Sequence, residues 1–288
     1  MQFLRCIFLS ACVALFHSTA ISQTQDNYQL VWSDEFDING FPDSTKWNYE
    51  KGFVRNEELQ WYQPENARCE NGLLLIEARR KQKPNPLYKA GSNNWRTNRQ
   101  NINYTSSCLI TRGKQHWQYG RFEMRARIDI DPGMWPAWWT LGIEKRWPGN
   151  GEIDIMEYYR DMLLANIVCR GKNNDQEWHT TKTSVKGLGG GAWAAQFHTW
   201  RMDWTEEYIA LFVDDSLLNK VAVKDLVNKD GSGFNPFKQP HYMLLNLAIG
   251  GQNGGDPQHT AFPKRMEVDY VRVWERAISP DRGVQPSL

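Results

Sequence analysis

The sequence predicts an all-β sandwich built from many short antiparallel strands. Apolar and polar residues alternate in short runs between residues 28 and 275, and turn residues separate these runs. Helical periodicity is nearly absent, since only residues 221–228 could form one or two helical turns. Strands that do not alternate with helices favour a sandwich over a doubly wound α/β fold. The 288 residues contain no internal repeat or linker, so we expect one domain over residues 27–276 and a tail at 277–288.

Each strand is expected where the alternation is regular. In residues 121–130 one face carries only charged side chains and the other only apolar ones. The charged face consists of Arg121, Glu123, Arg125, Arg127 and Asp129. The other expected strands are, in order, 73–76, 209–213, 242–249 and 266–274, and the turns beside them are Asn71-Gly72, Asp131-Pro132-Gly133, Asp214-Asp215 and Gly250-Gly251. Residues 83–105 contain prolines, a glycine and asparagines, and we expect a long surface loop there.

The composition excludes two broad classes of protein. Lys and Arg number 34 and Asp and Glu number 33, and the net charge of +1 argues against a nucleic-acid partner, which would require a basic surface. Charged residues make up 23% of the chain, which excludes a multi-span membrane protein. Tryptophan is abundant, with 14 residues, many of them between positions 135 and 204. Such a density indicates a heavy aromatic core or flat binding platforms.

The first 20 residues resemble a secretory signal peptide. Arg5 precedes an uncharged apolar stretch over residues 6–16, and Ser18 and Ala20 are the small residues typical of a cleavage site. The stretch is too short for a transmembrane anchor. We therefore expect a protein that is secreted or held at the cell surface or in the periplasm. In an alternative interpretation, residues 9–12 form a bacterial lipobox and Cys12 is a lipid anchor, although the apolar run continues beyond Cys12.

Three cysteines, Cys69, Cys108 and Cys169, remain after the signal peptide is removed. An odd number allows at most one disulfide within the chain, and the spacing resembles no zinc motif. We expect buried thiols that pack as small hydrophobic groups. A disulfide between Cys69 and Cys108 stays open as an alternative.

The motif with the clearest chemical meaning is Gly151-Glu152-Ile153-Asp154-Ile155-Met156-Glu157-Tyr158. On a regular strand Glu152 and Asp154 share one face, whereas Glu157 points to the other. A β-bulge near residues 155–156 would return Glu157 to the first face and place three carboxyl groups in a row. Adjacent carboxyls raise each other's pKa, so that one can hold a proton while another is ionised. Cleavage of a glycosidic bond requires this combination.

Two structural interpretations of the same motif compete with catalysis, namely a solvated face of an edge strand and a calcium site. Calcium prefers oxygen ligands on glycine-containing loops, and this segment is too aliphatic for a loop. The tryptophans favour catalysis, because sugar rings stack on aromatic faces. Trp135 and Trp139 share a strand face and Trp138 takes the other. We expect Trp135, Trp139 and Trp147 in a cleft and Trp138 in the core.

The motif at 151–157 resembles the signature of glycoside hydrolase family 16, in the bulged form typical of laminarinases. The resemblance covers about residues 30–275 and extends to further segments that follow in the family's order. These are Trp32-Ser-Asp-Glu-Phe36, Asn56-Glu-Glu-Leu-Gln60, Asn71-Gly-Leu73, Tyr119-Gly-Arg-Phe-Glu123, Gly133-Met-Trp-Pro-Ala137, Phe197-His-Thr-Trp200, Leu245-Asn-Leu-Ala-Ile-Gly-Gly251 and Val268-Asp-Tyr-Val-Arg-Val-Trp274.

The resemblance implies a β-jelly-roll of two curved antiparallel sheets with an open cleft on the concave face. It implies that Glu152 is the nucleophile, that Glu157 is the acid/base and that Asp154 tunes the pair between them. The residues at positions that resemble substrate-binding residues are Asn56, Arg121, Trp135, Trp139, Trp147 and Asn246. No cofactor is implied for catalysis. Family members often bind a structural calcium ion, for which Glu35 and Asp269 are candidates by position, and a plain salt bridge is the alternative.

The sequence departs from the laminarinase pattern at two places. Residues 165–170 lack a histidine that laminarinases usually carry, so that Asn166 or Arg170 would have to replace it. The glycine turn near the C-terminus continues with Gln252 instead of Trp.

From the motif and the resemblance together, we expect a monomeric endo-acting retaining β-glucanase that cleaves β-1,3-glucan or mixed-linkage β-1,3/1,4-glucan. A hydrolase of a red-algal galactan, a transglycosylase and a non-catalytic carbohydrate-binding jelly-roll are the alternatives.

Overall fold

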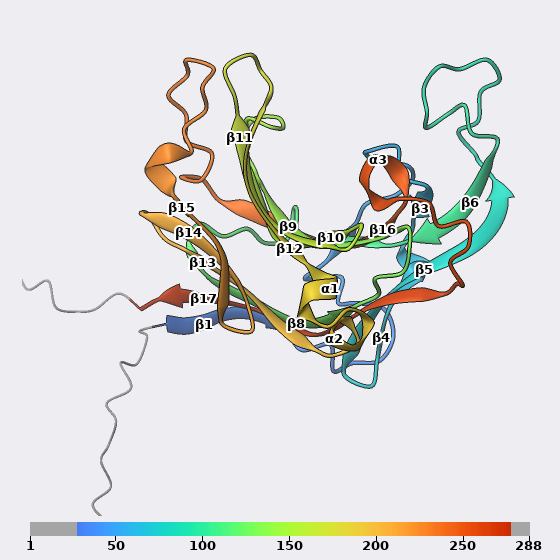
Figure 1. Cartoon of the computed structure of the whole chain (residues 1–288), viewed down its shortest axis with the longest axis horizontal. Coiled ribbons are helices and arrows are strands. Elements are labelled where there is room, and N and C mark those ends of the chain that lie inside the picture. The colour runs from blue at the N-terminus through green and yellow to red at the C-terminus, as the bar shows by residue number, and fades with distance from the viewer. Residues whose placement is uncertain (1–27, 278–288) are drawn as a thin grey trace, which may run out of the picture.

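Two curved sheets make up most of the chain in the computed structural model, which describes residues 28–277 (Figure 1). The larger sheet contains β1 (Tyr28–Asp34), β3 (Gln60–Tyr62), β4 (Ala67–Glu70), β5 (Leu73–Pro84), β6 (Asn101–Ser106), β8 (Gly120–Ile128), β13 (His198–Trp204), β14 (Tyr208–Val213), β15 (Ser216–Ala222) and β17 (Lys264–Arg276). The predictions for the signal peptide over residues 1–20, for Cys12 and for residues 278–288 of the tail lie outside the described residues.

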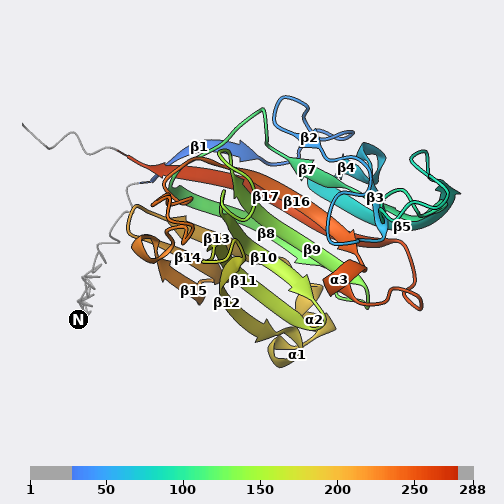
Figure 2. The ribbon, with the colours of Figure 1, turned by 90° about the horizontal axis from the view of Figure 1, so that it is seen from above.

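The smaller sheet lies against one face of the larger sheet. It contains β2 (Asn48–Tyr49), β7 (Cys108–Ile110), β9 (Met134–Gly142), β10 (Glu152–Tyr159), β11 (Met162–Arg170), β12 (Gln176–Ser184) and β16 (His241–Ile249). Its strand order is β12-β11-β10-β9-β16-β7-β2, with antiparallel pairing throughout (Figure 2). The catalytic-motif strand β10 therefore lies between β9 and β11, inside the sheet.

Helical structure is sparse in the described residues. It is limited to the short helices α1 (Val185–Leu188), α2 (Gly191–Ala194) and α3 (Gly251–Gly254) and the 3-10 turns η1 (Pro64–Asn66) and η2 (Val223–Asp225). Among residues 28–277 no helix is long and apolar enough to cross a membrane. The predicted all-β jelly-roll of two antiparallel-rich sheets is thus confirmed, and only β3 and β6 pair in parallel.

The core lies between the two sheets and is formed by the inward faces of their strands. β8 alternates strictly between buried and half-buried residues, as its sequence predicts, and buries Phe122 and Met124. Trp138 is fully buried, as expected because it lies on the face of β9 opposite to the face that carries Trp135 and Trp139. Burying apolar side chains of this size contributes roughly 2–3 kcal/mol each.

The prediction of a loop over residues 83–105 was wrong at both ends of that range. β5 continues to Pro84, and β6 begins at Asn101 and pairs with it, with Pro84 opposite Asn101. Pairing between neighbouring strands decided this local structure, and the polar composition of the segment did not reveal it. The loop itself is limited to the residues between these two strands.

The three cysteines are free and buried in the structure. Cys69 lies on β4 of the larger sheet and Cys108 on β7 of the smaller one, so that the alternative disulfide is absent. Burial raises the pKa of the Cys69 thiol to about 12 and that of Cys169 to about 11. Thiols of this kind pack as hydrophobic groups and react slowly.

Candidate active site

A cleft of about 470 Å³ lies on the face of the smaller sheet that points away from the core. Loops rise beside this sheet on both sides, among them the turn after β11 and the segment between β5 and β6 (Figure 1). The cleft is lined by Arg55, Asn56, Glu58, Trp135, Ala137, Trp139, Leu141, Trp147, Glu152, Asp154, Glu157, Trp178, Asn246, Gln252 and Asn253.

A β-bulge in β10 brings the three acids of the motif to the same face. The register with β11 shifts between Asp154 and Glu157, and the register with β9 shifts between Asp154 and Met156. Ile155 and Met156, the two adjacent apolar residues at the bulge, are both fully buried in the core. The extra residue therefore returns Glu157 to the face of Glu152 and Asp154, as the sequence predicts.

Neighbouring side chains hold the carboxyl groups in place with hydrogen bonds. The indole Nε1 of Trp147 donates to Glu152 Oε2 at 3.0 Å, and that of Trp135 donates to Glu157 Oε1 at 2.8 Å. Asn166 on β11 donates from Nδ2 to Asp154 Oδ2 at 2.8 Å. The outer two carboxyls are thereby each fixed by an indole.

The row of acids retains protons near neutral pH. Burial, followed by repulsion from the other two acids, raises the pKa of Glu152 well above its usual range. Burial raises the pKa of Asp154 to about 7, and burial together with the charge of Asp154 raises the pKa of Glu157 to about 8. Because the groups interact strongly, the protons leave in steps that belong to the whole row. Such a row can present a carboxylic acid and a carboxylate at the same pH.

The tryptophans of the cleft differ in how much ring surface they offer. Trp135 and Trp139 line the cleft as expected, but only 5% and 7% of their surface is exposed. Trp147 and Trp178 are each 44% exposed and present open ring surface. Trp178 on β12 was not identified from the sequence, although a large aromatic residue in a strand of otherwise polar side chains is a usable signal.

A buried polar chain extends along the floor of the cleft. Trp139 Nε1 donates to Asn246 Oδ1 at 2.7 Å, and Asn246 Nδ2 donates to the Tyr62 hydroxyl at 3.1 Å. Asn246 on β16 therefore lines the cleft, as the family resemblance implied.

Residues 55–58 form one side of the cleft. Asn56 lines the cleft as predicted, in the left-handed region of backbone conformation with φ of 52°. Glu58 is nearly fully buried, and burial raises its pKa. Glu58 was missed from the sequence, because it was recognised only as part of a motif and not as a separate carboxyl. Arg55 forms an ion pair with Glu50 and lies over the Trp139 ring at 4.9 Å.

The placement of Arg121 in the cleft was wrong. Arg121 lies on β8 of the larger sheet, where its Nε and Nη2 donate to Asp203 at 2.7 and 3.2 Å. The face of β8 opposite the core is the outer face of the larger sheet, whereas the cleft belongs to the smaller sheet. The charged stripe on β8 therefore forms ion pairs across neighbouring strands.

Glu35 and Asp269 do not fit a calcium site. Glu35 accepts two hydrogen bonds from Arg272, at 2.9 and 2.7 Å, and Asp269 accepts one from Arg125 at 2.6 Å. Arginine cations thus bind both carboxylate oxygens of Glu35 and one of Asp269, and a calcium ion would have to displace them. Among the described residues no group of three or more potential ligands is arranged to hold a metal ion.

The structure shows which residues stand at the two places where the sequence departs from the laminarinase pattern. Asn166 takes a place beside the acids, whereas Arg170 hydrogen-bonds to Asn174 at 2.8 Å and does not line the cleft. Gln252 and Asn253 line the cleft where a Trp platform is usual in the related pattern.

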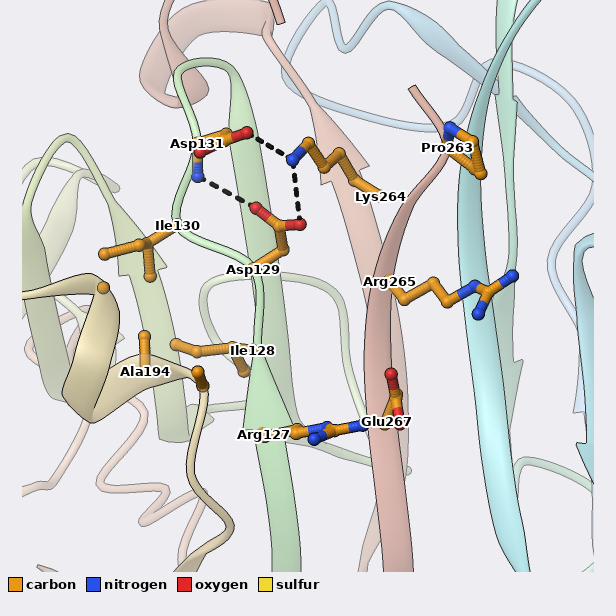
Figure 3. A pocket seen from close by; sticks show the side chains of 12 residues that line it. Arg127, Ile128, Asp129, Ile130, Asp131, Ala194, Pro263, Lys264, Arg265 and Glu267 are labelled. Atoms are coloured by element: carbon orange, nitrogen blue, oxygen red, sulfur yellow. Dashed lines mark hydrogen bonds and ion pairs between the residues drawn. The ribbon is translucent and has the colours of Figure 1, made fainter. Parts of the chain in front are cut away.

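A second hollow of about 570 Å³ lies beside β8 and β17 of the larger sheet (Figure 3). Lys264 forms ion pairs with Asp129 at 3.4 Å and with Asp131, and Arg127 pairs with Glu267 at 2.7 Å. The three carboxyls that line this hollow, Asp129, Asp131 and Glu267, are each paired with a cation, unlike the row of acids in the cleft of the smaller sheet.

A comparison with models of protein families identifies the family of this chain. The model of glycosyl hydrolases family 16 matches residues 58–272. The chain belongs to glycosyl hydrolases family 16. It is accordingly a glycoside hydrolase of the laminarinase-like branch, and this activity requires no catalytic cofactor.

Similar proteins include enzymes with different substrates. A β-glucanase from Rhodothermus marinus is 38% identical over 272 residues, which cover 88% of this chain and 87% of that enzyme. The crystal structure of the laminarinase from Rhodothermus marinus has a TM-score of 0.70 and 38% identity, with 87% of this chain and 98% of that chain covered. A structure from work on endo-acting O-glycanases of the human gut microbiota, which initiate mucin breakdown, has a TM-score of 0.79 and 31% identity, with 88% and 92% covered.

Proposed function

We propose that this hydrolase is an endo-acting, retaining β-glucanase that cleaves β-1,3-glucan or mixed-linkage β-1,3/1,4-glucan. The observation that carries the proposal is the row of Glu152, Asp154 and Glu157 in an open cleft. The similarity to a β-glucanase and a laminarinase supports a glucan as the substrate. The exposed rings of Trp147 and Trp178 supply stacking surfaces for sugar residues.

The proposed reaction proceeds in two displacements. Glu152 reacts as a carboxylate, the form that the charge of Arg55 and the hydrogen bond from Trp147 favour. Its oxygen attacks the anomeric carbon, the glycosidic C–O bond breaks, and the proton of Glu157 passes to the leaving oxygen. Glu157 then removes a proton from water, whose oxygen attacks the same carbon and releases Glu152. Asp154 lies between the two and raises the pKa of both glutamates. The net result is hydrolysis with retained anomeric configuration.

A second candidate function is hydrolysis of a galactose-containing glycan, such as a red-algal galactan. Two observations favour it. The structural match to the work on O-glycanases has a higher TM-score than the match to the laminarinase. Gln252 and Asn253 replace an aromatic platform, and the cationic Arg55 lines the cleft. A purely carbohydrate-binding role is less favoured, because it would not require the three acids.

The experiment that separates these candidates is a substrate panel with analysis of product sizes. Purified protein is incubated with laminarin, barley β-glucan, agarose, porphyran, xyloglucan and mucin O-glycans. Intermediate-length products from laminarin or barley β-glucan at early times support the proposal. Cleavage of only galactans or O-glycans would replace it with the second candidate, and transfer products on xyloglucan would indicate a transglycosylase.

We further propose that the chain is exported through residues 1–20 and acts as a monomer outside the cytoplasm. The sequence pattern of residues 1–20 supports export, and a polymeric substrate requires access from outside the cell. Labelling of expressing cells with a radioactive fatty acid, with Cys12→Ser as the control, tests the alternative of a lipid anchor. Light scattering of the purified protein tests the monomer.

A further inference from the structure

One side chain in the cleft contacts two of the three acids at once. Asn166 lies directly opposite Asp154 in the pairing of β10 with β11, and only 3% of its surface is exposed. Its Nδ2 donates to Asp154 Oδ2 at 2.8 Å and to Glu157 Oε2 at 2.9 Å. The β-bulge explains this double contact, because it brings Glu157 back to the face on which Asn166 lies.

The surrounding contacts fix the orientation of the amide. Asn166 Oδ1 is buried without a hydrogen-bond partner among the described residues, whereas both N–H groups of Nδ2 have carboxyl acceptors. In the flipped orientation the amide oxygen would face two acidic oxygens, which is unfavourable. An amide keeps both of its N–H donors at every pH, whereas a histidine loses one of its two donors when it deprotonates.

The carboxyl of Glu157 is consequently held at both oxygens. Trp135 Nε1 donates to Oε1 at 2.8 Å from β9, and Asn166 donates to Oε2 at 2.9 Å from β11. Donors from the two flanking strands thus define the plane of the carboxyl. An acid that protonates a leaving oxygen needs such a fixed direction, because proton transfer depends on alignment.

We propose that Asn166 is the positioning residue of the acid/base, which orients the Glu157 carboxyl toward the leaving oxygen and couples it to Asp154. This inference rests on the proposed function. Asn166 acts through Glu157, so its loss affects the step in which Glu157 donates a proton. Substrates that need little proton donation are affected less.

The first test compares two substrates that differ in leaving group. Asn166→Ala should lower kcat/KM on laminarin on the order of 10- to 100-fold, since general acid catalysis contributes roughly 10²–10⁴-fold. On an activated 2,4-dinitrophenyl glycoside of the same sugar, kcat/KM should fall less than about 3-fold, because that leaving group departs without an acid. The near-isosteric Asn166→Leu, which has no N–H group to donate, should show the same difference between substrates.

The second test is the pH dependence of kcat/KM on laminarin. The titratable groups that interact with Glu157 are Glu152, Asp154, Glu58 and Tyr159. Hydrogen bonds from Asn166 favour the ionised form of Glu157 and lower its pKa, so their removal in Asn166→Ala should raise it. The alkaline limb of the profile should therefore move to higher pH, by about half a unit or more.

Thr180→Ala is the matched control, since Thr180 lies opposite Asn166 on β12 and is exposed. It should leave both substrates and the pH profile unchanged. An equal loss on laminarin and on the aryl glycoside, or an alkaline limb that stays in place, would overturn the positioning role of Asn166. A wild-type protein that cleaves neither substrate would instead count against the proposed function, so that the two failures are distinguishable.

Discussion

The row of acids lowers the stability of the fold at neutral and alkaline pH, and Asp154→Asn should remove part of this effect. Asp154 is 5% exposed, and burial raises its pKa from 3.8 to about 7. Between these two pH values the unfolded chain releases a proton that the folded chain retains. The contribution of Asp154 to folding stability is therefore fully present below about pH 3.8. It is lost as the pH rises to about 7 and does not change further above that pH.

The magnitude follows from the size of the pKa difference. About three pKa units correspond to roughly 4 kcal/mol at pH 8, since one unit is about 1.4 kcal/mol. Asn at position 154 keeps an oxygen that can accept from Asn166, so the change removes mainly the charge. We expect a gain of about 2–4 kcal/mol at pH 8 and nearly none at pH 4. For a chain of this size the melting temperature should rise by about 2–4 °C per kcal/mol.

The assay is urea and thermal unfolding of both proteins at pH 4 and pH 8, together with turnover of laminarin. Glu35→Gln provides a control of opposite sign. The hydrogen bond from Arg272 lowers the pKa of Glu35, so this variant should lose a little stability at pH 8. The reasoning is refuted if Asp154→Asn is no more stable than wild type at pH 8, or if its gain is equally large at pH 4.

Three further predictions concern individual side chains of the proposed mechanism. The alkaline limb of the wild-type kcat/KM profile should fall near pH 8, where the pKa of Glu157 lies. In Glu157→Ala, added azide should restore turnover of an activated aryl glycoside and give a β-glycosyl azide as the product. Trp138→Ala should cost about 3–5 kcal/mol of stability, as unfolding measurements would show. Trp147→Ala should cost less stability but should lower both glucan affinity and kcat, because its exposed ring offers a stacking surface and its indole donates to Glu152. Arg121→Gln should leave kcat and KM unchanged, and a loss above about 3-fold would return Arg121 to the site.

Strand alternation predicted the sandwich because each sheet has one face in the core. Residues 121–130 illustrate this, since their apolar face is buried along β8. The same pattern could not show which outer face belongs to the cleft. The family resemblance put Arg121 in the cleft, and the alternation could not correct this, because a polar outer face looks alike in both sheets.

The bulge could be predicted from the motif because Ile155 and Met156 are adjacent apolar residues that both require burial. The hydrogen bonds to the acids could not be predicted. Trp135 and Asn166 reach Glu157 from two neighbouring strands, and their positions depend on the register of three strands together. Trp178 likewise joins the cleft only through the pairing of β12 with β11.

The exposure of each tryptophan also depended on the tertiary structure. The expected platforms Trp135 and Trp139 use their indole nitrogens for hydrogen bonds to Glu157 and Asn246 and are nearly buried. Trp147 lies on the loop before β10 and remains open. All three indoles donate hydrogen bonds, and sequence spacing placed all three near the acids, but it could not show that only Trp147 keeps an open ring surface.

Trapping of the covalent intermediate tests the central claim most directly. The protein is incubated with an activated 2-deoxy-2-fluoro laminaribioside, which forms the glycosyl-enzyme but hydrolyses it slowly, and is then digested and mapped by mass spectrometry. The account predicts one added disaccharide on the peptide that contains residues 151–158, attached to Glu152, and no adduct in Glu152→Gln. An adduct on another residue, or inactivation of the wild type without any adduct, would contradict the assignment of Glu152 as the nucleophile.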